Sequence, residues 1–241
     1  MTDQLIRWIA KEKQPVTKDS FVARKPEAER RSEIIDATIR EIGATGNLNV
    51  TVGQIAKSAG VSSGLAFHYF KDKDTLFLAA MRTILTNYRR DVSILTKGTT
   101  TPEARLEAIA NASFGLTSFR REAISAWVNF YALALRSPDA RRLLYIYQRR
   151  LHSNLVYTLR PSCGARAPDV ARRIGGLIDG LYLRYALDPQ ATDGSEGADH
   201  ILRAARAEQT ELHANDAMSV RDEDPNPMDP IAKPQELNDN A

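Results

Sequence analysis

The sequence predicts an all-α fold: an N-terminal three-helix domain of the helix-turn-helix type, followed by a larger C-terminal helical domain. Two observations favour this fold. Apolar residues recur at helical spacing along most of the chain, and a tight turn at residues 60–62 joins two short helical segments. The 241 residues are 43% hydrophobic and 26% charged, an ordinary globular composition that can supply a sizeable core.

The predicted helix-turn-helix domain occupies residues 24–72, and its first helix carries a clear apolar stripe. Pro26 lies near the start of this helix and Gly43 and Gly46 near its end, which are positions where helices commonly begin and stop. Residues 1–23 form an N-terminal extension in which helical periodicity is soon lost. The stripe consists of Ile34, Ile35, Thr38, Ile39 and Ile42.

The second and third helices are predicted from their capping residues. Thr51 followed three residues later by Gln54 is a capping box, and it opens a helix over 52–59. After the turn, Ser62 caps a short helix over 63–70. Two short helices joined by a three-residue turn have the layout of a helix-turn-helix. Asp72 then caps a long helix that begins the second domain.

The C-terminal domain is predicted over residues 73–212, with Pro138 and Pro161 as helix boundaries. Further helices are expected over 101–115, 121–136, 139–159, 169–187 and 195–212. Residues 213–241 contain four prolines and few large apolar residues, so we expect an acidic, disordered tail there.

The charge of the chain is unevenly distributed. Residues 98–187 contain 13 basic and 6 acidic residues, whereas 188–241 contain 4 and 13. A basic body with an acidic tail suggests a polyanionic partner for the body, although solvation alone also explains it.

The single cysteine, Cys163, and the lack of a signal peptide indicate a reducing cytoplasm. The longest apolar run, Ala123 to Leu135, is too short for a membrane span.

The stretch "GVSSGLAFHYFKDKDTL" has the chemistry of a DNA-binding helix. Small residues at the start of the helix, such as Ser63 and Gly64, allow its end to enter a major groove. The polar tips of His68 and Tyr69, and Lys73 on the next helix, are placed for phosphates that flank the groove, while Phe70 packs inward. A surface aromatic cluster in some other all-α protein is the alternative reading of these residues alone.

"TVGQIAKSAGVSSGLAFHYFKDKDTLF", Thr51 to Phe77, resembles the DNA-binding signature of the TetR family of transcriptional repressors. Two later stretches, "SAWVNFYALAL" and "GLIDGLYLRYAL", resemble the branch of that family that controls the choline-to-glycine-betaine pathway. The likeness covers roughly residues 27–187. It implies a sequence-specific repressor that binds double-stranded operator DNA as a homodimer and responds to a small effector.

The resemblance also implies roles for individual residues. Thr51 would contact phosphate, the start of the third helix would face the bases, and the aromatics after it would clamp the backbone together with Lys73. Leu65 stands where threonine or isoleucine is common and cannot hydrogen-bond to a base, so specificity would depend on DNA shape or on an arm at Arg24 and Lys25. The implied DNA-contacting set is Thr51, Ser62, Ser63, Gly64, Leu65, Phe67, His68, Tyr69 and Lys73.

An effector site is predicted from aromatic residues in the second domain. Trp127, Phe130 and Tyr131 share one helix face, and Tyr145 and Tyr182 lie on helices able to converge on them. Such rings form a cage for a quaternary ammonium ion, and the family resemblance favours choline. An aromatic core stripe explains the same spacing. A lipophilic drug or an acyl ligand also fits it.

A close approach between helices is suggested by three glycines within a predicted helix, Gly175, Gly176 and Gly180. The resemblance assigns this approach to a dimer interface with 195–212; an intramolecular bundle is the alternative.

No enzyme is expected, because the four histidines lack metal-ligand spacing and "GGLIDG" lacks the strand of a dinucleotide site. No catalytic residue, metal or cofactor is therefore predicted. An all-α carrier and a non-specific architectural DNA binder remain as alternative functions.

Overall fold

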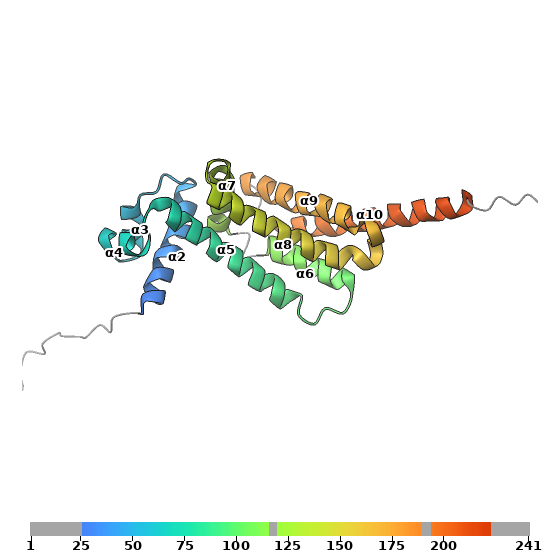
Figure 1. Ribbon diagram of the computed structural model, residues 1–241, viewed down its shortest axis with the longest axis horizontal. Coiled ribbons are helices and arrows are strands. Elements are labelled where there is room, and N and C mark those ends of the chain that lie inside the picture. Colours follow the sequence, from blue (N-terminus) through green and yellow to red (C-terminus); the bar gives the residue numbers. More distant parts are fainter. Residues whose placement is uncertain (1–25, 116–119, 189–193, 223–241) are drawn as a thin grey trace, which may run out of the picture.

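The computed structural model describes residues 26–115, 120–188 and 194–222, and these residues contain helices and no strand. Figure 1 shows an elongated molecule with α2, α3 and α4 at one end and a bundle of longer helices at the other. The elements are α2 (Glu27–Thr45), α3 (Val52–Ser58), α4 (Ser63–Tyr69), α5 (Lys73–Leu95), α6 (Pro102–Phe114), α7 (Arg121–Arg136), α8 (Pro138–Cys163), the 3₁₀ turn η1 (Gly164–Arg166), α9 (Ala167–Leu187) and α10 (Ser195–Asp222).

The capping residues predicted for the first domain are confirmed. The Thr51 hydroxyl accepts a hydrogen bond from the Gln54 amide at 3.2 Å, and the Thr51 amide donates to the Gln54 side chain at 2.8 Å. Ser62 accepts from the Leu65 amide at 3.2 Å. These side chains satisfy amide groups that a helix start leaves without partners, so each short helix begins at a residue fixed by local chemistry.

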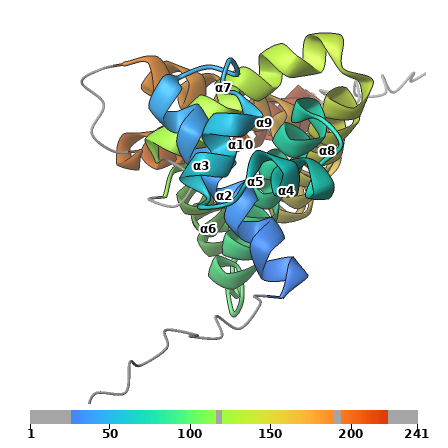
Figure 2. The same ribbon diagram turned by 90° about the vertical axis from the view of Figure 1, so that its left-hand side faces the viewer.

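The first domain shares its core with α7. Ile34 of α2, Ile55 of α3 and Leu76 at the start of α5 are fully buried, and Phe70 is 2% exposed, as its predicted inward packing requires. Gly60 adopts a φ of 66°, in the left-handed region that favours glycine, and it produces the sharp turn between α3 and α4. Figure 2 looks at the molecule from this end and shows α3 and α4 lying outermost.

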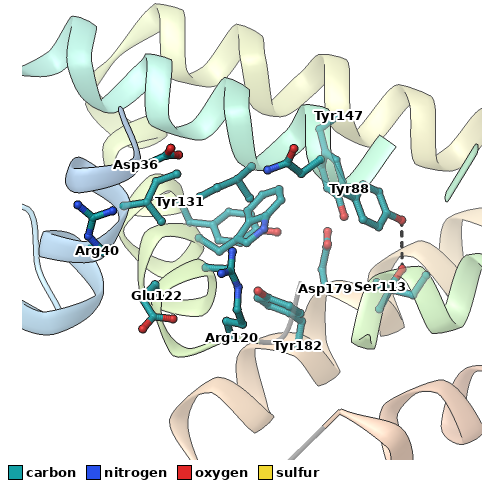
Figure 3. Close-up of a pocket in the computed structure, with 16 residues that line it drawn as sticks. Asp36, Arg40, Tyr88, Ser113, Arg120, Glu122, Tyr131, Tyr147, Asp179 and Tyr182 are labelled. Carbon is teal, nitrogen blue, oxygen red and sulfur yellow. Dashed lines mark hydrogen bonds between the residues drawn. The ribbon is translucent and has the colours of Figure 1, made fainter. Parts of the chain in front are cut away.

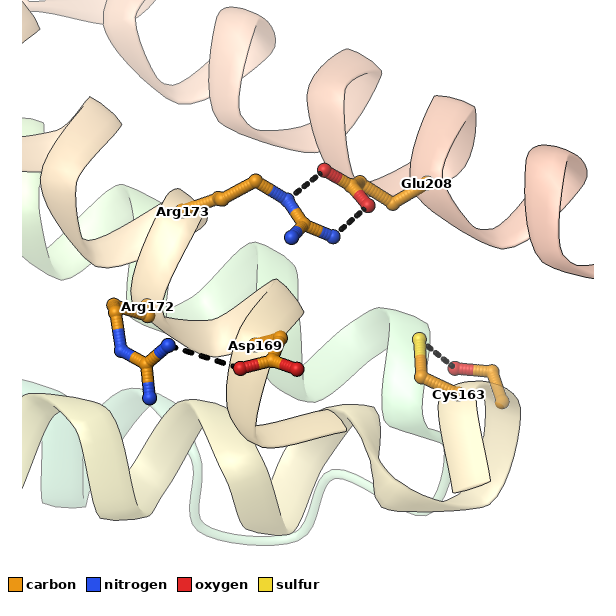
Figure 4. Close-up of polar contacts among 6 residues, drawn as sticks. Cys163, Asp169, Arg172, Arg173 and Glu208 are labelled. Carbon is orange, nitrogen blue, oxygen red and sulfur yellow. Dashed lines mark hydrogen bonds and ion pairs between the residues drawn. The ribbon is translucent and has the colours of Figure 1, made fainter. Parts of the chain in front are cut away.

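The long helix α5 leads from the first domain into the bundle, where a second core lies between α6, α8, α9 and α10. Leu155, Ile174 and Ile201 are buried at its centre. Arg173 of α9 donates two hydrogen bonds to the Glu208 carboxylate of α10, as Figure 4 shows. This bidentate pair fixes α10 against α9, although its contribution to stability is small because the guanidinium is about half exposed.

The structure differs from the sequence prediction at two helix ends. The predicted stop before Pro161 is wrong, because α8 continues through it to Cys163 and ends at Gly164. A proline in the last turn removes only one backbone hydrogen bond, and the helix ends two residues later. Cys163 is thus buried at the end of α8.

The helix α10 continues to Asp222 instead of ending at Leu212, so the first part of the predicted acidic tail is helical. The rest of that tail, the N-terminal extension and the arm at Arg24 and Lys25 lie outside the described residues. Among the described helices, none is long and apolar enough to cross a membrane.

Candidate DNA-binding surface and effector pocket

The residues expected to contact DNA lie on the outer side of α4 and at its borders. Ser62, Ser63, Gly64 and His68 are exposed, and Phe67 is 52% exposed, which is unusual for so large an apolar ring. Ala66, on the opposite face of the same helix, is fully buried. α4 has only two turns, and its buried face at Ala66 packs against the rest of the domain. The side chains on its other faces therefore point toward solvent.

The borders of this surface are polar. Thr51 is exposed at the start of α3, and Leu65 and Tyr69 are half-buried. The rings of His68 and Tyr69 meet edge to face, with their centroids 5.4 Å apart. The Lys73 ammonium lies 5.3 Å from the Phe77 ring centroid, at the start of α5. The structure thus brings all nine predicted residues to one end of the molecule, where hydroxyl, imidazole and ammonium donors surround a short exposed helix.

A pocket of about 450 Å³ lies between the first domain and the bundle, a volume within the usual range for small-molecule sites. Its walls come from α2, α5, α6, α7, α8 and α9, as Figure 3 shows. It is lined by Asp36, Ile39, Arg40, Ile84, Asn87, Tyr88, Ser113, Arg120, Glu122, Ala123, Trp127, Tyr131, Tyr147, Ile178, Asp179 and Tyr182.

Aromatic rings gather around Trp127 in this pocket. The centroid of the Trp127 ring lies 4.8 Å from that of Tyr147, 5.7 Å from Tyr131 and 6.4 Å from Tyr182. Tyr88 meets Tyr147 edge to face at 5.8 Å and shares a hydrogen bond of 3.1 Å with the Ser113 hydroxyl. Four helices therefore contribute rings to a single aromatic box.

A carboxylate is enclosed with these rings. Burial raises the pKa of Asp179 to about 6, and a hydrogen bond with Tyr131 opposes this rise. Figure 3 shows the carboxyl group directed to the side of the pocket where Tyr147 lies. Burial also raises the pKa of Tyr88 to about 12 and that of Tyr131, Tyr147 and Tyr182 above the ordinary value, so these hydroxyls stay neutral. At pH 7 the rings are therefore neutral, and Asp179 is the one carboxylate that their helices place among them; Asp36, Arg40, Arg120 and Glu122 line the rest of the pocket.

The predicted effector set agrees with this pocket in part. Trp127, Tyr131 and Tyr182 line it. Phe130 does not, because it lies 1% exposed in the core beside Trp127. Tyr145 does not line this pocket: its ring is 57% exposed, and the Arg149 guanidinium carbon lies 5.9 Å from the ring centroid. Tyr147 takes its place, because a step of two residues turns a helix by about 200° and reverses the face that a side chain occupies.

Tyr88, Tyr147 and Asp179 also line the pocket and were not predicted from the sequence. The signal for Asp179 was present in "GLIDGLYLRYAL", where the aspartate precedes Tyr182 by three residues and so shares its helix face. A single acidic residue inside an apolar stripe is a common mark of a site. Tyr88 lies on the apolar stripe of its helix with Ile84 and Leu85, which a core position explains equally well, and the helix of Tyr147 is aromatic and basic on several faces.

The mouth of the pocket is charged and includes the first domain. Asp36 and Arg40 come from α2, and Arg120 and Glu122 lie at the start of α7. The Arg40 guanidinium also donates a hydrogen bond of 3.4 Å to the Ser58 carbonyl at the end of α3. One side chain of the pocket mouth thus contacts the helix that precedes the DNA-facing turn.

The seam between α2 and α7 joins the two domains. The Ser125 hydroxyl donates to the Ile42 carbonyl at 3.1 Å, and the Asn129 amide donates to the Gly46 carbonyl at 3.1 Å. These bonds satisfy carbonyls at the end of α2. A Cβ on Gly43 would lie 2.6 Å from the Glu122 Cα, so only glycine allows this approach. The helix that carries Trp127 and Tyr131 therefore packs directly on α2.

Comparison with known proteins gives a match for each of the two domains. Residues 34–80 match the profile of bacterial regulatory proteins of the tetR family, and residues 102–210 match the C-terminal domain of BetI-type transcriptional repressors. The chain is 50% identical over 167 residues to the HTH-type transcriptional regulator BetI of Brucella abortus (strain 2308), covering 69% of this chain and 84% of the relative. The chain belongs to the TetR family. It is a BetI-type transcriptional repressor.

Further relatives of this BetI-type repressor are similar in kind. The BetI regulator of Rhizobium meliloti (strain 1021) is 44% identical over 159 residues, covering 66% of this chain and 78% of the relative. A transcriptional regulator from Pseudomonas aeruginosa PAO1 shares the fold with a TM-score of 0.65 at 23% identity, covering 80% and 96% of the two chains. A regulator from Saccharomonospora viridis, solved in complex with choline, has a TM-score of 0.65 at 22% identity, covering 73% and 94%.

Proposed function

We propose that this repressor binds a quaternary ammonium ion, choline or a close relative, in the pocket around Trp127, and that binding releases operator DNA. The observation that carries the proposal is the Asp179 carboxylate enclosed by aromatic rings. A buried anion beside neutral rings is costly when the site is empty, and a cation removes that cost.

The physical attraction has two parts. Each ring of an aromatic box contributes about 0.5–2 kcal/mol by cation–π attraction. The carboxylate adds a charge pair in a site where burial weakens screening by solvent. A trimethylammonium group suits such a box because it cannot donate hydrogen bonds and loses little hydration on burial. The choline complex of the structural relative from Saccharomonospora viridis supports the same ligand class.

Release of DNA follows from the way the pocket is built. Asp36 and Arg40 of α2 form part of its mouth, and α7 supplies both Trp127 and the seam with α2. A ligand that draws the rings inward moves α7. α2 moves with α7 because the two helices are in close contact at Gly43. A small rotation of α2 changes the position of α4 relative to a DNA groove. The effector acts only through its preference for one of these two arrangements.

We propose the nine residues on and around α4 as the DNA contacts, with Thr51, Tyr69 and Lys73 on phosphates and the start of α4 facing the bases.

A twofold operator requires a twofold protein. We assign the dimer interface to α9 and α10. A Cβ on Gly176 or Gly180 would meet no atom within 4 Å in the single chain, and Leu183 and Leu187 on the same helix are exposed. That open, apolar face of α9 is suited to a second copy.

A gel-shift experiment with the DNA upstream of the protein's own gene tests this function. We expect specific binding without ligand and release when choline is added. Calorimetry should show heat for choline and none of comparable affinity for 3,3-dimethylbutan-1-ol, its neutral isostere. Equal binding of the isostere would contradict the proposed cation site, and unchanged operator binding with choline bound would contradict the proposed release.

A further inference from the structure

The molecule has a second large cavity, outside the aromatic box. It is a groove of about 670 Å³ along α5 and α8, to which α6 contributes one residue, Arg105. Tyr88 and Tyr147 line both cavities and stand between them, with ring centroids 5.8 Å apart. The two spaces are therefore neighbours with a common aromatic wall, and a ligand in one does not need the volume of the other.

The groove is strongly cationic. Four arginines line it, Arg82, Arg89, Arg105 and Arg150, and its lining contains no aspartate or glutamate. Within the described residues, none of the four forms a salt bridge. Unpaired cations that converge on one groove from three different helices create a positive potential that favours an anionic occupant.

Arg105 is the most unusual of the four. Its guanidinium stacks on the Tyr157 ring with a carbon-to-centroid distance of 5.0 Å, so the group is held in one orientation. Its Nε is buried and, among the described residues, has no hydrogen-bond partner. A buried donor without a partner is rare and costly, and it marks a position where an acceptor is missing.

The groove is also amphipathic along its length. As Figure 1 shows, α5 and α8 run side by side in the same direction, away from the DNA-binding end. Their distal parts bring Arg89, Arg150 and the polar Thr96 and Asn154 to the end where Arg105 lies, on α6, together with the buried apolar Val92 and Leu151. Their proximal parts bring apolar side chains, Leu85, Leu143 and Ile146. Arg82 is the one lining arginine at the apolar end, and it is exposed, as Arg89 and Arg150 are.

The geometry points to a second ligand site in this groove, for an anionic amphiphile with a single alkyl chain. Its carboxylate or phosphate accepts hydrogen bonds from Arg105 and Arg150, with Arg89 beside them, and its chain lies on the apolar residues toward the DNA-binding end. Arginine is suited to both headgroups because its planar fork matches two acceptor oxygens. The apolar half disfavours nucleic acid as the occupant. This site is independent of the proposed choline response.

Calorimetry on the full chain tests the site, with sodium dodecanoate and dodecyl phosphate below their micelle concentrations. Both should bind, and the tighter of the two identifies the headgroup. Dodecan-1-ol should bind at least about tenfold more weakly, because it lacks the charge that the arginines recognise. Butanoate should not bind measurably, because it lacks the chain.

A charge-matched pair of double variants locates the site. Arg105→Gln with Arg150→Gln should weaken dodecanoate at least about tenfold. Arg142→Gln with Arg160→Gln removes two exposed arginines of α8 outside the groove and should leave the affinity within about twofold. If the first pair fails to fold, the single change Arg89→Gln at an exposed position should still weaken dodecanoate about threefold.

Saturating choline separates this site from the aromatic box. Dodecanoate binding that persists when choline is bound supports two sites. If choline does not bind, the charge-matched pair of double variants alone decides where dodecanoate binds. The proposal is overturned if neither amphiphile binds, if dodecan-1-ol binds as well as dodecanoate, if both double variants weaken binding alike, or if choline and dodecanoate compete.

Discussion

The DNA-binding end and the effector pocket are built in opposite ways. On α4, the functional side chains are neighbours in the sequence, and three local caps fix where each helix begins. In the pocket, the lining comes from six helices, and residues as distant as Asp36 and Tyr182 face the same space. A site made from consecutive residues depends on local hydrogen bonds, whereas a site made from many helices depends on how their faces pack.

The largest effect should come from Asp179→Asn, which removes the only negative charge enclosed by the rings. We expect choline affinity to fall about a hundredfold, as for loss of a partly buried charge partner. In the unaltered protein, affinity should also fall as the pH is lowered through about 6, because protonation of Asp179 removes the same charge. Calorimetry at pH 5 to 8 measures both, and the Asn variant should show no such pH dependence.

The same substitution should make the ligand-free protein more heat-stable at pH 7.5. The pKa of Asp179 is higher in the folded state than its unfolded value of 3.8. The contribution of Asp179 to the stability of the fold is therefore favourable at low pH, where the carboxyl is protonated, and is lost as the pH rises through about 6. Asparagine is never ionised, so it avoids this loss. Asp169→Asn, an exposed change on the same helix, is the control and should leave choline affinity unaltered. A variant that kept choline affinity would show that the pocket is no cation site.

Trp127→Leu should have the next largest effect. Leucine keeps apolar volume but removes the best ring for a cation, so choline affinity should fall about tenfold or more while operator binding is retained. Phe130→Leu is the matched control, because Phe130 is a buried neighbour on the same helix that does not line the pocket. Both variants lose packing, so equal losses of choline affinity would mean that the rings act only as core.

Gly43→Ala tests the connection between the two regions. The added Cβ would lie 2.6 Å from the Glu122 Cα, so α2 and α7 must separate, at a cost of about 1–3 kcal/mol in unfolding free energy. We expect the ability of choline to weaken operator binding to diminish, as measured by titrating the operator with and without choline. Gly53→Ala, where no atom lies closer than 3.8 Å, should leave stability the same or slightly higher.

Lys73→Ala should weaken DNA binding modestly and by the same factor for operator and random DNA. Loss of one phosphate contact should reduce the slope of log K against log salt concentration by about 1. Lys97→Ala, beyond the far end of α5, should leave the slope unchanged. A loss confined to the operator would assign Lys73 to base recognition.

The smallest effect is expected at Tyr145, whose ring is exposed and lies outside the pocket. Tyr145→Ala should keep choline affinity within about twofold, whereas Tyr147→Ala should weaken it about tenfold. The two positions differ only in the helix face they occupy. Equal effects would show that α8 presents a different face in the ligand-bound protein.

These differences explain how far the sequence alone could reach. The caps at Thr51, Ser62 and Asp72 act within three residues, so the DNA-binding helices could be placed from the pattern. Trp127, Tyr131 and Tyr182 were found because spacing on one helix or a likeness to relatives marked them. Tyr88 and Tyr147 could not be assigned to the pocket from the sequence. Packing between helices far apart in the chain decides which face of α5 or α8 turns toward Asp179.

α2 belongs both to the DNA-binding domain and to the wall of the pocket, so the proposed release of DNA by an effector implies a reciprocal effect of DNA on effector binding. Thermodynamic linkage requires that operator DNA weaken the effector by the factor with which the effector weakens DNA, typically about 5- to 150-fold. A dimer on a strong operator therefore needs a higher effector concentration for release than one on a weak operator. Genes controlled by operators of graded strength would then be induced in sequence as the effector accumulates, by one repressor and one effector.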